Sequence, residues 1–271
     1  MSKRIQSPSS INIYKQCPRK YYYQYKLKLP TKPSIHLIRG SIVHTVIENF
    51  FKNIPLADDK NYPLRLKTIL QEELVKEWKL NEEKLNELKL TKEQLFFYFD
   101  ETISMILNFS EILIKKIELE ISKGLNFSEA FRKLCPISEE KFVSEKYSVM
   151  GYIDAIEKRE DGIYIMDYKT SKGNEINDQY KLQLSIYTLL FYEKYKEMPK
   201  KVGIFFLKHE EKFIDASYDL IKEAEFEIEQ IHSSTTTDNK EDYPMKPSPL
   251  CKWSSGQCDF YELCFSKNGK F

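Results

Sequence analysis

The chain has 271 residues and no apolar run long enough to span a lipid bilayer. Its first residues lack the apolar core of a secretory signal, so we expect an intracellular, cytoplasmic protein without membrane partners. No G-x-x-x-x-G-K-[ST] sequence occurs, which excludes a P-loop ATPase motor within this chain. Disulfides are rare in that compartment, so the five cysteines call for another explanation.

Acidic residues are absent from the first 47 positions. The basic residues in that segment are Lys3, Arg4, Lys15, Arg19, Lys20, Lys26, Lys28, Lys32 and Arg39. The tyrosines interleaved with them are Tyr14, Tyr21, Tyr22, Tyr23 and Tyr25. Basic groups neutralise phosphates and aromatic rings stack on unpaired bases, so the segment is predicted to bind nucleic acid. For the tyrosines alone, a buried helix face is the alternative interpretation.

Two short apolar runs each carry an aspartate, Asp154 within residues 152–157 and Asp167 within residues 163–168. The Asp-Gly step between the runs is typical of a hairpin turn. A hairpin would bring the two carboxylates side by side at the sheet surface, where they need a cation between them. Lys169 follows Asp167 by two residues, so strand alternation places it on the same face.

Hydrolysis of a phosphodiester needs an activated water and neutralisation of phosphate charge, and Mg²⁺ or Mn²⁺ ions held by carboxylates provide both. We assign Asp154 and Asp167 as ligands of such a metal. Lys169 would position the water or stabilise the charge of the pentacoordinate intermediate. His44 would add an imidazole ligand, which favours Mn²⁺, and the backbone carbonyl of Tyr168 would complete the coordination sphere.

Each of these signals has an ordinary alternative when taken singly. A D-x-K triplet on a strand is commonly an exposed ion pair, and a lone histidine is commonly a packing residue. Their co-occurrence favours the site, together with Gln183 and Tyr187, which lie four residues apart on one helix face. Glu48 shares a helix face with His44 and is assigned only as a possible outer group.

Hydrophobic periodicity and capping signals predict the elements that carry these residues. Helices are expected from residue 8 to about 17, from about 18, and over 42–51, 62–80, 91–122, 176–196 and 218–232. Strands are expected over 141–149, 152–157, 163–168, 201–208 and 212–217. A polar linker at 233–238 precedes an irregular tail, and no internal repeat is present.

Several segments of the chain resemble motifs of the PD-(D/E)XK nucleases, in their RecB-like branch. In chain order they are S-S-I-x-x-Y-x-x-C-P-x-K-Y at 9–21, G-S-I-V-H at 40–44, G-Y-I-D at 151–154, M-D-Y-K-T at 166–170 and Q-x-x-x-Y at 183–187. The resemblance spans nearly the whole chain. It implies that His44, Asp154 and Asp167 bind metal, that Lys169 is catalytic, and that Gln183 and Tyr187 contact DNA or support the site.

The resemblance also implies the fold class: an α/β restriction-endonuclease-like core with a central mixed β-sheet flanked by helices, plus a helical subdomain and a cysteine-bound C-terminal tail. A single nuclease domain is expected over residues 1–271. Within it we expect N-terminal helices at 7–52, the helical subdomain at 60–135, the catalytic core at 139–232 and the cysteine-rich tail at 240–271.

Three cysteines, Cys251, Cys258 and Cys264, are clustered near the end of the chain, and Cys17 lies far upstream. Together they would complete a Cys₄ site that pins the tail to the N-terminal helices. Spacing alone leaves zinc, iron–sulfur and simple buried thiols open. The resemblance to AddB-type and CRISPR-associated RecB-like nucleases implies a [4Fe–4S] cluster, although six residues separate Cys251 from Cys258 where the family usually has two. Cys135 is interpreted as an ordinary buried thiol.

These observations predict a metal-dependent DNA nuclease, an exonuclease on single strands or DNA ends. It would act alone or with a helicase, a recombinase or a CRISPR integrase, in recombination, repair, phage biology or CRISPR spacer acquisition. A non-catalytic nucleic-acid-binding module and an RNA-directed nuclease are the alternatives. The set of Asp154, Asp167 and Lys169 argues against the first, because a scaffold has no need of that charge cluster.

Overall fold

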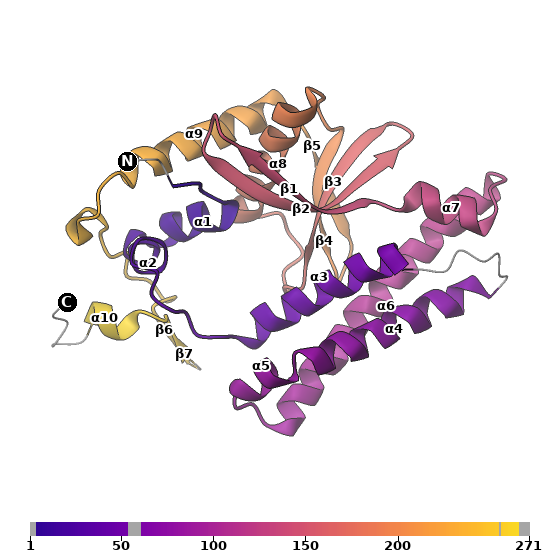
Figure 1. Ribbon diagram of the computed structural model, residues 1–271, viewed down its shortest axis with the longest axis horizontal. Helices are drawn as coiled ribbons and strands as arrows, with labels where there is room; N and C mark the ends of the chain where they lie inside the picture. The colour runs from indigo at the N-terminus through magenta and orange to yellow at the C-terminus, as the bar shows by residue number, and fades with distance from the viewer. Residues whose placement is uncertain (1–3, 54–60, 255, 266–271) are drawn as a thin grey trace.

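The computed structural model describes residues 4–53, 61–254 and 256–265 of the chain. Lys3 of the basic segment lies outside those ranges. So do the first and last residues of the single domain predicted over residues 1–271. A mixed β-sheet stands between two layers of helices (Figure 1). This arrangement confirms the fold class that the sequence predicted.

A long run of helices precedes the first strand, and α8 and α9 each follow a group of strands. The helices are α1 Pro8–Gln16, α2 Pro18–Tyr21, a π-helix Tyr22–Lys26, α3 Ile35–Asn53, α4 Tyr62–Leu80, α5 Glu82–Glu87, α6 Lys92–Ser122, α7 Phe127–Leu134, α8 Asp178–Tyr195, α9 Tyr218–Ser234, a 3₁₀ turn Lys240–Asp242 and α10 Tyr261–Phe265. The strands are β1 Ile137–Ser144, β2 Val149–Arg159, β3 Gly162–Lys169, β4 Lys201–Phe206, β5 Glu211–Asp215, β6 Lys252–Trp253 and β7 Gly256–Gln257.

The five long strands form one sheet in the order β1-β2-β3-β4-β5. Neighbours are antiparallel except β3 and β4, which are parallel. A parallel pair needs a crossover connection, and α8 provides it. β2, β3 and β4 are buried on both faces, which explains their near-continuous apolar sequences.

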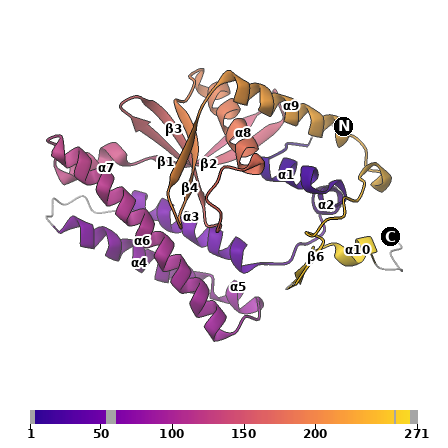
Figure 2. The same ribbon diagram turned by 180° about the vertical axis from the view of Figure 1, so that it is seen from behind.

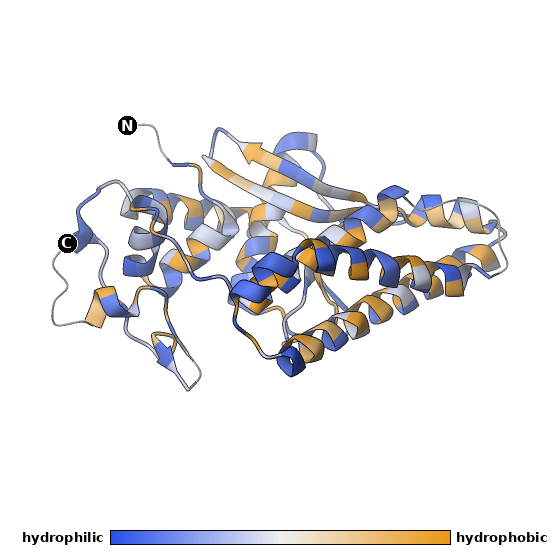
Figure 3. Ribbon diagram, turned by 60° about the horizontal axis from the view of Figure 1, so that its bottom comes forward, coloured by the Kyte–Doolittle hydropathy of each residue, from blue (hydrophilic) through white to orange (hydrophobic). Residues whose placement is uncertain are grey.

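Each face of the sheet is covered by its own apolar core. One core joins the sheet to α1, α8 and α9, and the other joins it to α3, α4, α6 and α7. Viewed from behind, the same two layers remain separated by the sheet (Figure 2). In α6 the buried residues recur at helical spacing, and the hydropathy colouring shows apolar and polar residues alternating along α4 and α6 (Figure 3).

Several element boundaries differ from those predicted, and two of the differences are large. α3 begins at Ile35, not at residue 42, because Gly40 lies inside the helix; a helical glycine costs only about 1 kcal/mol, which the buried Ile38 and Ile42 offset. The strand predicted over 141–149 is divided: β1 ends at Ser144, and β2 begins at Val149 after a turn.

Of the two interpretations of the N-terminal tyrosines, the buried helix face is confirmed for the three central ones, which belong to the core and not to a base-stacking surface. Tyr21, Tyr22 and Tyr23 have at most 7% of their surface exposed. They pack around Tyr243 and Phe260 of the C-terminal segment. The physical reason is that these rings, with Tyr243 and Phe260, belong to the core on the α8 and α9 side of the sheet.

Acids from the C-terminal half neutralise part of the basic N-terminal segment. Lys15 forms an ion pair with Glu227 of α9. The Lys26 ammonium lies 2.9 Å from a carboxylate oxygen of Asp238. Part of the positive charge of the acid-free segment is therefore balanced by acidic residues that lie far away in the sequence.

Candidate functional site

The β2–β3 hairpin brings Asp154 and Asp167 to neighbouring strands, as predicted. The turn is Glu160 and Asp161, since Arg159 pairs with Gly162, and the ladder runs to the pair Ala155–Met166. Asp154 and Asp167 come directly after that pair in the same register. Contrary to the prediction, they are not at an open sheet surface: 7% and 2% of their surfaces are exposed, because α3 and α8 contribute side chains that cover them.

Asp154 is held by two groups from different elements. The Nδ1 atom of His44, on α3, lies 3.3 Å from one carboxylate oxygen. The backbone N–H of Tyr168 on β3 donates a hydrogen bond of 2.7 Å to the other. The predicted histidine and aspartate are thus adjacent, although 110 positions separate them.

Asp167 is held by side chains of α8 and by its own strand. Gln183 Nε2 donates to Asp167 Oδ1 at 2.7 Å, and the Tyr187 hydroxyl donates to the same oxygen at 3.3 Å. Gln183 also donates to the Tyr187 hydroxyl at 2.7 Å. The Lys169 ammonium lies 2.7 Å from Asp167 Oδ2. Gln183, Tyr187 and Lys169, all expected near the metal site, therefore surround one carboxylate.

The buried charges shift the acidity of the site. Burial, and then the charge of Asp167, raises the pKa of Asp154 to about 6, while His44 opposes that rise. Burial alone would lower the pKa of Lys169, but Asp167 and Asp154 outweigh it and raise the pKa, so the ammonium stays charged. Burial, and then Asp167, also raises the pKa of Tyr187 well above its ordinary value, which keeps its hydroxyl protonated as a donor.

The donor set suits a hard divalent cation. Within the described residues, no group of three or more His, Cys, Asp or Glu side chains is arranged as a complete metal site. Asp167 Oδ2 is nevertheless buried without a hydrogen bond among those residues, and its close contact is the Lys169 ammonium. Two buried carboxylates and an imidazole are chemically fit to hold Mg²⁺ or Mn²⁺. The residues that fit are Asp154, Asp167 and His44.

Two further residues stand near the site. Glu48, the possible outer group, pairs with Lys52 on its own helix. Arg39, expected to face nucleic acid, is 2% exposed; its guanidinium lies 2.6 Å from Glu101 of α6 and donates to the Thr170 carbonyl at 3.3 Å. Sequence reasoning missed this contact because Glu101 is 62 positions away and carries no motif.

Gly151, at the start of the G-Y-I-D segment, makes room for α8. A Cβ at this position would lie 2.9 Å from a ring carbon of Tyr187 and 3.3 Å from Leu190. We expect Gly151→Ala to lower the free energy of unfolding by about 1–3 kcal/mol, as overpacking does. Chemical denaturation would measure it. Gly173→Ala is the matched control, because a Cβ there meets nothing within 4 Å; equal effects of the two variants would contradict the assignment.

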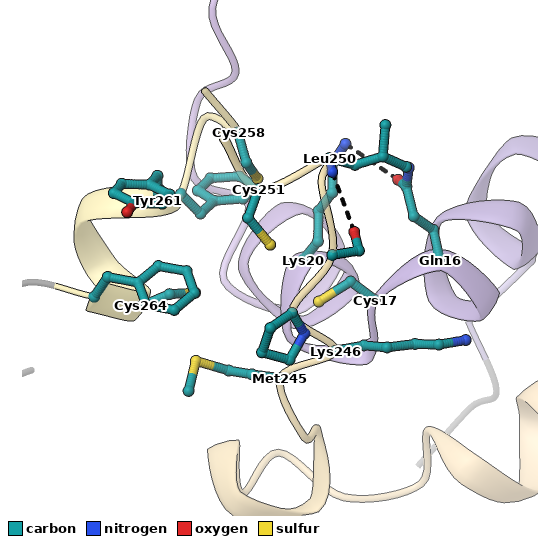
Figure 4. Close-up of a pocket in the computed structure, with 14 residues that line it drawn as sticks. Gln16, Cys17, Lys20, Met245, Lys246, Leu250, Cys251, Cys258, Tyr261 and Cys264 are labelled. Carbon is teal, nitrogen blue, oxygen red and sulfur yellow. Dashed lines mark hydrogen bonds between the residues drawn. The ribbon is translucent and has the colours of Figure 1, made fainter. Parts of the chain in front are cut away.

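The four cysteines predicted to act together line one pocket between the chain ends. Cys17 comes from the junction of α1 and α2, and Cys251, Cys258 and Cys264 come from the tail (Figure 4). Burial, and then the neighbouring Cys17 and Cys258, raises the pKa of the Cys264 thiol. Cys135 lies elsewhere and is exposed, so its prediction as a buried thiol is wrong: it follows α7 at the surface end of that helix.

Comparisons with known proteins show what this chain is similar to. The model of the PD-(D/E)XK nuclease superfamily matches residues 6–265. The chain is 27% identical over 255 residues to a subunit of the ATP-dependent helicase/deoxyribonuclease of Clostridium tetani, a match that covers 82% of this chain and 21% of that protein. It is 26% identical over 236 residues to the subunit of the same name in Clostridium novyi, covering 79% of this chain and 20% of that one. The chain thus spans about a fifth of the length of these curated relatives.

A solved structure shares the fold. The crystal structure of a protein named "Putative exonuclease" from Eubacterium rectale superposes with a TM-score of 0.50 at 13% identity, covering 97% of this chain and 94% of that one.

Within the described part of the chain, none of the helices has the length and apolar character that a bilayer crossing requires.

Proposed function

The chain belongs to the PD-(D/E)XK nuclease superfamily, and we propose that it is a metal-dependent DNA nuclease that degrades single-stranded DNA or DNA from an end. One observation carries this proposal: two buried carboxylates on adjacent strands, with a charged lysine 2.7 Å from one of them. A protein that only binds nucleic acid gains nothing from burying two like charges, because burial, and then the charge of Asp167, raises the pKa of Asp154 and costs stability.

We assign each side chain one task. Asp154, Asp167 and His44 hold a Mg²⁺ or Mn²⁺ ion, with the Tyr168 carbonyl as a further ligand. That metal supplies neutralisation of phosphate charge and a more acidic water. Lys169 keeps a positive charge where negative charge develops on the phosphate oxygens.

Gln183 and Tyr187 act through Asp167 in this proposal. Both donate to the same carboxylate oxygen, which leaves the other oxygen for the cation. Fixed donors of this kind orient a ligand and typically contribute on the order of 10- to 100-fold in metal affinity or activity. Contacts of these two side chains with DNA itself remain part of the proposal.

The relatives suggest a setting for the activity. Because the matching proteins are named as helicase/deoxyribonuclease subunits, we propose DNA as the substrate and a helicase as the partner that delivers single strands. A recombinase or a CRISPR integrase would present similar ends, in recombination, repair, phage biology or spacer acquisition. Product lengths and the proteins that co-purify with the chain distinguish these settings.

The decisive experiment uses DNA labelled at its 5′ or its 3′ end, as single strand and as duplex, with a matched RNA in parallel. We expect cleavage with Mn²⁺ or Mg²⁺ and none with EDTA. An exonuclease releases short products from one label from the earliest times, whereas an endonuclease produces a spread of lengths. Preference for RNA would establish the RNA-directed alternative, and the absence of cleavage with every metal would establish the non-catalytic module.

We propose that Cys17, Cys251, Cys258 and Cys264 hold a [4Fe–4S] cluster, with zinc as the rival occupant. Support comes from four thiols lining one pocket and from the similarity to AddB-type proteins. Protein purified without oxygen is expected to be brown, with broad visible absorbance and about four irons per chain. Colourless protein with one zinc per chain would identify a zinc site. Cys135 lies outside the pocket, so Cys135→Ser is the control variant that should keep the metal.

A further inference from the structure

One face of α3 runs beside the chain that leaves β3, and it extends the site beyond the carboxylates. His36, Gly40 and His44 are spaced four residues apart and share this face. His44 contacts Asp154, and Gly40 lies opposite Thr170, whose hydroxyl would be 3.9 Å from a Cβ at that position. His36 lies one helical turn before Gly40 on α3, farther from the two carboxylates.

The surface around His36 carries an excess of positive charge. The His36 imidazole is close enough to four charged side chains to feel their charge. Three of them are cations, Arg39, Lys172 and Lys208, and one is an anion, Glu101. Glu101 is already engaged, because its carboxylate lies 2.6 Å from both Arg39 and Lys208. Lys172 is exposed and has no ion pair among the residues described. Three cations around one acid leave a net positive charge near His36, and Lys172, three residues after Lys169, is the cation exposed at the surface.

Two aromatic rings, the half-buried Tyr98 and the exposed Phe97, continue this surface onto the first turns of α6. The Tyr98 ring lies 5.7 Å from the His36 ring, and the Arg39 guanidinium lies 5.5 Å from the Tyr98 ring centre. Phe97 contacts Tyr98 at 5.5 Å between ring centres and is 54% exposed. The beginnings of α3 and α6 lie at the same end of the helical layer (Figures 1 and 2). An exposed phenyl ring near a lysine that forms no ion pair among the described residues fits a chain of alternating bases and phosphates.

We propose that His36, Lys172 and Phe97 form a strand-binding surface that guides single-stranded nucleic acid to Lys169. The Lys172 ammonium contacts phosphates, and the Phe97 ring stacks on a base. Charge complementarity and continuity with the site through Thr170 favour this occupant over a protein. The inference rests on the proposed function, and it replaces the N-terminal tyrosine segment, whose Tyr21, Tyr22 and Tyr23 are buried, as the route of the strand.

Binding of a fluorescein-labelled oligo(dT) to the full chain tests the proposal, measured by anisotropy in EDTA over a series of salt concentrations. Phe97→Ala is expected to weaken binding by roughly fivefold or more, with the salt slope unchanged. Lys172→Ala is expected to weaken binding and to lower the slope of log K against log salt by about 0.7. Phe226→Ala and Lys222→Ala on α9 are matched controls, with Phe226 59% exposed, and should bind as the wild type does.

The outcomes separate this inference from the proposed function. If the wild type binds and cleaves the strand while Phe97→Ala and Lys172→Ala match it in affinity and slope, the strand-binding surface is wrong and the nuclease assignment stands. A dimer that Phe97→Ala dissociates in light scattering, with unchanged DNA affinity, would likewise overturn it in favour of self-association. If the wild type neither binds nor cleaves with any metal, both proposals fail together.

Discussion

Replacing Lys169 with methionine is expected to slow phosphodiester cleavage about 100- to 1,000-fold, the usual cost of losing one preorganised group that stabilises transition-state charge. Methionine keeps most of the side-chain length, with sulfur in place of Cδ, and removes the ammonium, which lies 2.7 Å from Asp167. Single-turnover cleavage with protein in excess over labelled DNA measures the chemical step. The loss should appear in that rate rather than in the affinity for DNA.

A stability measurement separates this effect from misfolding. In the variant, the buried Asp167 loses its cationic neighbour, so the unfolding midpoint should fall without metal. Added Mn²⁺ should then raise the midpoint more in Lys169→Met than in the wild type, because the ion supplies the missing charge. Lys181→Met is the control: this lysine, on α8, pairs with Glu223 at 2.9 Å and should leave cleavage unchanged. Equal rates for Lys169→Met and the wild type would remove Lys169 from the mechanism.

The parts of the site that sequence could predict are those fixed by local geometry. Hairpin register makes Asp154 and Asp167 neighbours once the turn is known, and strand alternation places Lys169 beside Asp167. Helical spacing places Gln183 and Tyr187 on one face. These relations depend on periods of two and of about four residues, which a sequence displays directly.

Burial and long-range pairing could not be predicted in the same way. Nothing near Asp154 in the sequence indicates that α3 would cover it, and nothing near Arg39 points to Glu101. The ambiguity over Tyr21 has the same origin, because a basic, aromatic helix looks alike whether its rings meet DNA or another part of the chain. Only the packing of the C-terminal segment, brought back across the whole fold, decides between the two.

That packing suggests that the tail is held by more than its cysteines. Tyr243 is fully buried, lies 6.3 Å from Tyr21 and 5.0 Å from Tyr22 between ring centres, and donates a hydrogen bond of 2.7 Å to the Thr237 carbonyl. Its own carbonyl accepts from Arg19 at 2.6 Å. An aromatic anchor therefore lies between the chain ends, next to the cysteine pocket but independent of any metal.

Tyr243→Ala is accordingly expected to lower the free energy of unfolding by about 3–5 kcal/mol, the usual cost of truncating a fully buried large aromatic side chain. Chemical denaturation of metal-loaded and metal-depleted protein measures it. The loss should appear in both forms if the anchor acts by packing. Tyr218→Ala is the control, since that ring is 58% exposed on α9 and its loss should stay within about 0.5 kcal/mol.

The comparison with Cys17→Ser decides which contact fixes the tail. If the cysteine site alone holds it, Cys17→Ser should release the segment after Tyr243 to limited proteolysis, and Tyr243→Ala should not. Without metal we expect the opposite: the protease should cleave the tail of Tyr243→Ala faster than the tail of Cys17→Ser. The reason is that the tyrosine packing and the Arg19 contacts do not need the ion. Restoration of protease resistance to Tyr243→Ala by metal loading would show that both anchors hold the same segment, since binding free energy then offsets the lost packing.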